Sequence, residues 1–167
     1  PNPDNYQGLW WNPAESGWGI NLAHQGDIIY ATWFTYDADG KPWWLASTLK
    51  RSGGVFSGTV YTSSGPSFDS VRWVPSSVKA VPVGSMTLTF TSAGKGSLSY
   101  SVNGMAQTKA IEKQLWGAEP ACVWGGETDL TKARNYTDLW WNADEPGWGM
   151  NLVQQSNTCL LYTSPSP

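Results

Sequence analysis

The sequence predicts an all-β fold, an antiparallel up-and-down β-barrel of about eight strands. Apolar and polar residues alternate in short runs, residues typical of tight turns separate these runs, and no stretch carries a convincing helical stripe. A flat sheet of this many twisted strands would leave two open edges, and closure into a barrel removes both of them. A two-sheet β-sandwich is the alternative architecture.

The expected strands share this alternation, and turn residues separate most of them. They are residues 8–12, 17–24, 28–37, 42–51, 55–62, 83–92, 96–103 and 105–116. Asn103-Gly104, between two alternating runs, is the strongest hairpin signal. The long connection 63–83 is interpreted either as a lid over one barrel mouth or as a surface loop whose Trp73 packs on the barrel wall. Residues 127–134 are expected to form at most a short turn of helix.

Composition excludes several classes of function. The 167 residues include 10 Lys+Arg, 13 Asp+Glu and 12 Trp, for a net charge of -3, and no basic cluster is present, so we expect no nucleic-acid partner. No apolar run approaches the roughly 20 residues of a membrane span. One His and two distant Cys give no metal-ligand spacing, so we expect neither a metal nor another cofactor.

An internal repeat organises the chain. Residues 5–27 and 135–157 are identical at 13 of 23 aligned positions, at an offset of 130 residues. This period is too long for a solenoid and fits tandem copies of a whole domain. We therefore expect a complete repeat at 5–116, a linker at 117–134 and a truncated second repeat at 135–158.

Both ends of the chain are interpreted as cut. Residues 159–167 resemble the conceptual translation of a sequencing adapter, so we expect a non-native tail; a natural Ser/Pro-rich tail is the alternative. The sequence begins at Pro1 and contains no signal peptide. Two strands cannot bury a core alone, so we expect the second repeat to be disordered, to pair with an open edge, or to swap into another molecule and cause self-association.

The segment Leu9-Trp10-Trp11-Asn12-Pro13-Ala14-Glu15-Ser16-Gly17-Trp18-Gly19-Ile20-Asn21-Leu22 resembles a Trp-rich repeat module of secreted bacterial proteins. The resemblance implies export, to the medium or the cell surface, and a modular arrangement. Gly8-Leu9-Trp10 also resembles, loosely, the Gly-x-Trp of the first strand of avidins and lipocalins. That likeness implies only a similar barrel.

The clustering of tryptophans points to a ligand. Six of them fall within 35 positions on neighbouring strands, and in each adjacent pair one ring should face inward and the other outward. We therefore predict a non-catalytic module that binds a glycan or a small aromatic or apolar ligand. The residues expected to bind it are Trp10, Trp11, Asn12, Glu15, Trp18, Asn21, Trp33, Trp43 and Trp44.

Other interpretations of the same residues stay open. The tryptophans could bury between barrels, as in a structural, adhesive or self-associating repeat. Glu15 recurs as Glu145 and could be a turn carboxylate that binds backbone N–H groups, or the general acid of a small glycoside hydrolase. No catalytic pair is fixed by the spacing, so we assign no catalytic residue.

Overall fold

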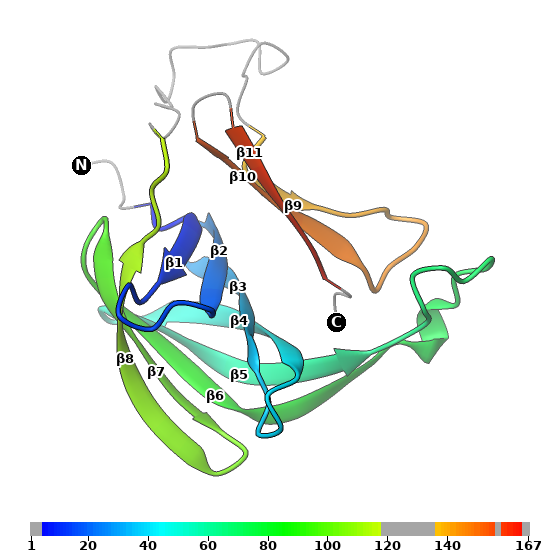
Figure 1. The fold of residues 1–167 in the computed structure, drawn as a ribbon, viewed down its shortest axis with the longest axis horizontal. Coiled ribbons are helices and arrows are strands. Elements are labelled where there is room, and N and C mark those ends of the chain that lie inside the picture. Colours follow the sequence, from blue (N-terminus) through cyan, green and yellow to red (C-terminus); the bar gives the residue numbers. More distant parts are fainter. Residues whose placement is uncertain (1–4, 118–135, 156–157, 165–167) are drawn as a thin grey trace.

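The computed structural model describes residues 5–117, 136–155 and 158–164, and the first copy of the repeat is a closed barrel of eight antiparallel strands (Figure 1). This confirms the predicted fold class. Each strand pairs with the next along the chain, and the last pairs with the first. The strands are β1 (Gly8–Trp11), β2 (Gly19–Gln25), β3 (Ile28–Tyr36), β4 (Pro42–Ser52), β5 (Val55–Ser64), β6 (Lys79–Ser92), β7 (Lys95–Val102) and β8 (Met105–Lys113).

The alternating residues fill the barrel as their period predicts. Met86, Leu88 and Leu98 face inward and are at most 1% exposed, whereas the Ser and Thr residues between them face outward. The β7–β8 hairpin turns through Asn103 and Gly104, whose φ angles are +49° and +82°. Positive φ at both central residues is the backbone of a type I′ turn, which explains why this dipeptide predicted a hairpin.

Two local features affect how β6 pairs with its neighbours β5 and β7. Pairing between β5 and β6 shifts register between Val60 and Tyr61, and Tyr61 pairs with Pro82. Gly84 allows β6 to approach β7 closely, because a Cβ at this position would lie 1.8 Å from the carbonyl oxygen of Ser101. Tight packing at this point therefore requires glycine.

The barrel closes along a short seam between β1 and β8. Trp10 pairs with Lys113 and Trp11 pairs with Glu112, and the backbone N–H of Gln114 donates to the carbonyl of Leu9 at 2.8 Å. Every other neighbouring pair of barrel strands is joined over a longer stretch. The seam is the least extensive pairing of the barrel.

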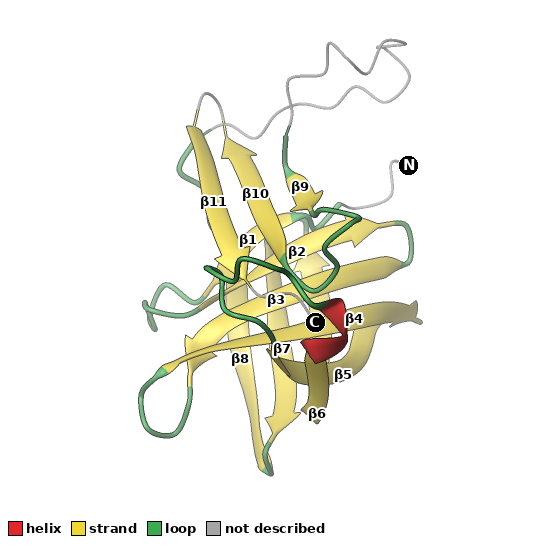
Figure 2. Cartoon of the chain, turned by 90° about the vertical axis from the view of Figure 1, so that its right-hand side faces the viewer, coloured by secondary structure: helices red, strands yellow, loops and turns green. Residues whose placement is uncertain are grey.

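The second copy forms a separate three-stranded sheet of β9 (Asp138–Trp140), β10 (Gly149–Gln155) and β11 (Thr158–Ser164). Its described residues are ordered into strands, in contrast to the expected disorder. They do not pair with a barrel strand, because a closed barrel has no free edge. Figures 1 and 2 show the sheet lying alongside β1, β2 and β3. The pairing of Gly149 with Ser164 and of Gln155 with Thr158 reproduces that of Gly19 with Phe34 and of Gln25 with Ile28.

The segment that resembles an adapter therefore takes part in the fold, since residues 158–164 occupy the position that β3 has in the first copy. Most of the expected linker, and the expected turn of helix at 127–134, lie outside the described residues.

The long loop between β5 and β6 contains a 3-10 turn at Pro75–Ser77. Its Trp73 donates a hydrogen bond from Nε1 to the carbonyl of Pro146 at 2.8 Å, so it contacts the second copy. This contact with the second copy differs from both interpretations of the loop, as a lid and as a surface loop whose Trp73 packs on the barrel wall.

Candidate binding site at one mouth of the barrel

One end of the barrel gathers four connections, and we call this end the site mouth. They are the β1–β2 turn at 12–18, the β3–β4 turn at 37–41, the β5–β6 loop at 65–78 and the β7–β8 hairpin at 103–104. Because neighbouring strands are antiparallel, alternate connections must meet at the same end. Most of the tryptophan-rich signature lies on the strands and turns that lead to this end.

Strand alternation brings aromatic and charged side chains into the interior near the site mouth. Trp33 pairs with the inward residues Ile20 and Leu45, so its ring also faces inward and is only 4% exposed. Lys109 pairs with the buried Leu98, so the lysine side chain starts on the same inner face. Two rungs further along, Tyr100 pairs with Gln107 and donates its hydroxyl hydrogen to the Gln107 Oε1 atom at 2.8 Å.

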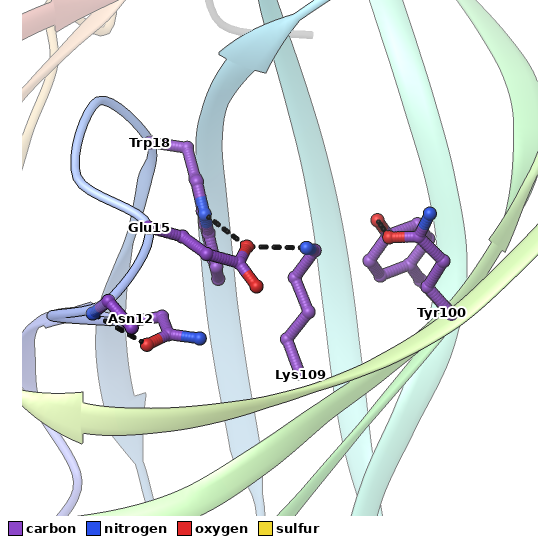
Figure 3. A network of polar contacts seen from close by, with 7 residues as sticks. Asn12, Glu15, Trp18, Tyr100 and Lys109 are labelled. Atoms are coloured by element: carbon purple, nitrogen blue, oxygen red, sulfur yellow. Dashed lines mark hydrogen bonds and ion pairs between the residues drawn. The ribbon is translucent and has the colours of Figure 1, made fainter.

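A charged network lies at the site mouth. Figure 3 shows the Glu15 carboxylate between the Trp18 indole and the Lys109 ammonium, with Tyr100 beyond the lysine. Trp18 donates from Nε1 to Glu15 Oε2 at 3.1 Å, and Lys109 Nζ lies 2.5 Å from the same oxygen and 5.6 Å from the centroid of the Trp18 ring. The lysine is therefore held by an ion pair and a cation–π contact at once. This network ties the β1–β2 turn to β8, the strand that pairs with β1.

The β1–β2 turn holds Glu15 in place. Asn12 accepts from the backbone N–H of Ala14 through Oδ1 at 3.0 Å, and its carbonyl accepts from the N–H of Glu15 at 2.9 Å. Gly17 has a φ of +113°, which disfavours any side chain at this position.

The second copy builds the same turn. Asn142 binds the N–H groups of Asp144 and Glu145, the indole of Trp148 donates to Glu145 at 3.1 Å, and Gly147 has a φ of +115°. These recurring residues therefore have a structural role in the turn, whatever else they do.

The pKa of Glu15 is lowered, chiefly by the hydrogen bond from Lys109. A general acid needs the opposite shift, because it must hold its proton near neutral pH. Burial raises the pKa of Tyr100, so its hydroxyl stays protonated and acts as a neutral donor. The mouth thus offers a fixed carboxylate, an ammonium and a phenol.

One buried polar atom at this end has no partner. The Nε1 of Trp33 is buried and makes no hydrogen bond within the described residues. Its ring lies 4.6 Å from that of Tyr100, at an interplanar angle of 53°. Trp43, half-buried nearby on β4, is satisfied by a hydrogen bond from its Nε1 to Thr62 at 3.0 Å. An orphaned donor beside an aromatic rim is an arrangement that a ligand acceptor would complete.

The structure divides the nine residues predicted to bind a ligand into four groups. At the site-mouth end lie Glu15, Trp18, Trp33 and Trp43, of which Glu15 and Trp18 contact each other, and Asn12 belongs to the β1–β2 turn. Trp10 is fully buried in the core and donates from Nε1 to the carbonyl of Tyr6 at 2.8 Å. The residues that face outward from the barrel are Trp11, Asn21 and Trp44, of which Asn21 is buried against the second copy.

Sequence reasoning missed Lys109 and Tyr100. Tyr100 lies on β7 and Lys109 on β8, far along the chain from the tryptophan-rich segment. A signal did exist for the lysine: the alternation around Ile111 places Lys109 on the inner, apolar face of β8. A charged residue in that register indicates a partner inside the barrel.

The opposite end of the barrel is filled by aromatic rings. Tyr6 stacks on Phe90 at 3.7 Å between centroids and on His24 at 5.5 Å, and Phe56 meets Tyr6 edge-on at 6.1 Å. The backbone N–H of Tyr6 also donates to His24 Nδ1 at 3.1 Å. This end contributes to the core, which leaves the site mouth as the better candidate for a ligand.

A shallow groove of about 440 Å³ also runs over β6, β7 and β8, and it shares Tyr100 and Gln107 with the site mouth. Its lining is mostly Ser and Thr and includes no tryptophan: Ser85, Met86, Thr87, Ser99, Tyr100, Ser101, Ala106, Gln107 and Thr108. Without an indole platform, and open to solvent along its length, it offers less to a ring-bearing ligand than the mouth does.

Comparison of the chain with protein-family models, curated proteins and solved structures gave no match. Within residues 5–117, 136–155 and 158–164, no cluster of three or more His, Cys, Asp or Glu side chains could hold a metal ion. The same described residues include no helix long and apolar enough to cross a membrane. The function is therefore argued from the geometry of the mouth.

Proposed function

We propose that this chain is a non-catalytic binding module of an exported bacterial protein and that the site mouth binds a glycan or another ring-bearing ligand. The observation that carries the proposal is the buried Nε1 of Trp33, which makes no hydrogen bond within the described residues and whose ring lies 4.6 Å from that of Tyr100. A ligand hydroxyl or other acceptor would satisfy this donor, and the indole faces would cover a flat ring.

The chemistry of the rim suits a polar ring better than a purely apolar one. Sugar rings present C–H faces that pack on indoles and hydroxyls that exchange hydrogen bonds. Glu15 can accept from such hydroxyls and Lys109 can donate to them, whereas Tyr100, whose hydrogen is already donated to Gln107, can accept. Because Glu15 and Lys109 already form an ion pair, the ligand is expected to carry no strong net charge.

Adjacent Trp43 and Trp44 provide a matched test. Trp43 faces the mouth and packs against the core, whereas Trp44 is 39% exposed and sits on the outer face, edge-on to Phe34 at 6.1 Å. Tryptophan fluorescence and calorimetry would be used to titrate the full chain with soluble polysaccharides and small hydrophobic compounds. Replacement of Trp43 by Ala should cost about 1–3 kcal/mol of affinity, on the scale of a buried aromatic side chain, and Trp44→Ala should cost almost nothing.

The proposal fails if no compound of either class gives a saturable response, or if the two variants lose affinity equally. Far-UV circular dichroism of both variants verifies that the barrel is intact before affinities are compared. A response to polysaccharides alone would identify a glycan, and a response to hydrophobic compounds alone an apolar ligand.

The second candidate function is a structural, self-associating repeat, and a specific contact favours it. Asn21 on the outside of the barrel is buried against Asn151 of the second copy, at 2.8 Å between the two amides. Sedimentation of the full chain across a range of concentrations tests this candidate. Assembly that disappears when the outer Trp11 or Trp44 is replaced by Ala would support it, and a monomer at all concentrations would contradict it.

A further inference from the structure

Residues at equivalent positions of the two copies contact each other directly. Asn21 donates from Nδ2 to Asn151 Oδ1 at 2.8 Å, and Gln7 donates from Nε2 to the carbonyl of Thr137 at 2.6 Å. The members of each pair are 130 residues apart, which is the offset of the repeat. A residue meets its own counterpart where a rotation axis passes through the contact, and for two copies that pack through the same face this axis is a local two-fold.

The burial of β10 shows which faces are involved. Asn151, Val153 and Gln155, at positions that face outward in the first copy, are only 2–3% exposed. Their neighbours Met150 and Leu152, at positions that face inward in the first copy, are merely half-buried. The second copy therefore packs through the outer face of its first hairpin.

The first copy is buried through the same outer face. Asn21 and Ala23 point away from the barrel interior, yet they are 3% and 6% exposed. The covered surface continues as a row across four adjacent strands, in which each residue pairs with the next and is 7% exposed or less. The row consists of Leu9, Asn21, Thr32 and Ala46. None of these four residues is charged, as expected at the centre of a protein interface.

Contacts at the periphery hold this arrangement. Gln155 accepts from the backbone N–H groups of Trp116 and Gly117 at 2.7 and 3.0 Å, and it donates to the carbonyl of Gln114 at 2.9 Å. At the other end, Trp73 binds the Pro146 carbonyl at 2.8 Å. Gly147 beside it has no room for a Cβ, which would lie 2.4 Å from the Val78 side chain. The packing is therefore specific along the length of β10.

The residue on the axis has the chemistry that symmetry requires. A side chain that meets its own copy must be self-complementary, because a carboxylate or an ammonium would face a like charge. The amide of asparagine carries both a donor and an acceptor and can pair with another asparagine. Asn21 Oδ1 is buried and makes no hydrogen bond within the described residues. It could therefore accept a second hydrogen bond from the Asn151 amide, which would make the pair reciprocal.

We propose that the outer face of β1 and β2 is a self-complementary docking surface, and that its partner is another copy of the same repeat. Copies pair back to back about the axis through Asn21 and Asn151, as β9 and β10 do on the first barrel. This surface is distinct from the site mouth, and its role does not depend on any ligand bound there.

The test uses hydrogen exchange by mass spectrometry on the full chain, read at the amides of residues 149–155. With Asn21→Asp and Asn151→Asp combined, two like charges meet on the axis, and the three-stranded sheet loses its packing face. Exchange in β10 should then accelerate by about ten-fold or more. Thr48→Asp, which adds the same charge to an exposed outward position of β4, should leave β10 unchanged.

Symmetry makes a sharper demand. The reciprocal pairs Asn21→Asp with Asn151→Lys, and Asn21→Lys with Asn151→Asp, place opposite charges on the axis in either order. Both should restore slow exchange and agree within about three-fold. Parent-like exchange in the double aspartate variant, or restoration by only one reciprocal pair, overturns the proposal.

Amides of β6 and β7 report in the same experiment whether the barrel itself has opened. If the charged variants open it, Asn21→Ala and Asn151→Ala are compared singly. Each removes one amide of the pair without adding charge, so both should accelerate exchange in β10, and by a similar factor. No acceleration in either variant, or factors that differ by more than about five-fold, again overturns the proposal.

Discussion

Trp10 and Trp140 are equivalent residues of the two copies in very different surroundings. Each donates from Nε1 to the carbonyl of the tyrosine four residues earlier, at 2.8 and 3.1 Å. Trp10 is fully buried inside the closed barrel, whereas Trp140 is 45% exposed on the face of β9 that points away from the barrel. The same substitution at the two positions separates the value of the local hydrogen bond from that of enclosure.

Replacement of Trp10 by Ala removes a ring that buries about 150–250 Å² and leaves a cavity among Tyr6, Phe90 and the strand side chains. Such changes cost about 3–5 kcal/mol. Replacement of Trp140 by Ala opens no enclosed cavity and loosens only the small sheet. We expect the free energy of unfolding of the barrel to change by less than about 0.5 kcal/mol.

Urea unfolding followed by circular dichroism gives both values, and hydrogen exchange in β6 and β7 assigns the transition to the barrel. A loss below about 1.5 kcal/mol for Trp10→Ala would contradict the enclosed core, since the deleted ring alone exceeds that value. Equal losses at the two positions would mean that the barrel and the small sheet unfold as one unit.

Three further predictions concern the barrel and its mouth. Burial lowers the pKa of His24, so the unfolded chain takes up a proton first; stability is full above about pH 6.5 and falls as the pH drops through the folded-state pKa. Gln154 takes the place of His24 in the second copy and accepts the equivalent hydrogen bond, so His24→Gln should keep the fold and flatten the pH dependence of thermal unfolding below about pH 6.5. Gly84→Ala should cost about 1–3 kcal/mol in urea unfolding, whereas Gly94→Ala, with open space around the new Cβ, should cost little; equal losses would contradict the close approach of β6 and β7. Lys109→Met should raise the Glu15 pKa in a carboxylate NMR titration, and an unchanged value would show that the ion pair is absent in solution.

Most of the fold could be predicted because its information is local. Alternation and turn residues placed the majority of strand ends within one or two residues of those observed. The main exception is β6, which begins at Lys79 where 83 was expected, because Pro82 interrupts the pattern. The structure tolerates this proline beside the register shift at Val60, where a ladder hydrogen bond is dispensable.

The site could be predicted only in part, because its missing members depend on long-range placement. The alternation of paired tryptophans is correct for Trp10, which is buried, and for Trp44, which is exposed. Lys109 reaches Glu15 across 94 positions of sequence, and only barrel closure brings them together. The burial of Asn21 depends on where the second copy docks, which no local pattern encodes.

The seam between β1 and β8 has a consequence for the kinetics of the barrel. Its strands lie at the two ends of the first copy, so pairing them closes a loop of about 100 residues, an entropic cost that no adjacent hairpin bears. With so few paired residues, it should form last and open first. Gln155 binds the backbone just beyond β8, at 114–117, so the docked hairpin acts as a latch on this weakest junction. A neighbouring copy would thereby slow the opening of the barrel on which it rests.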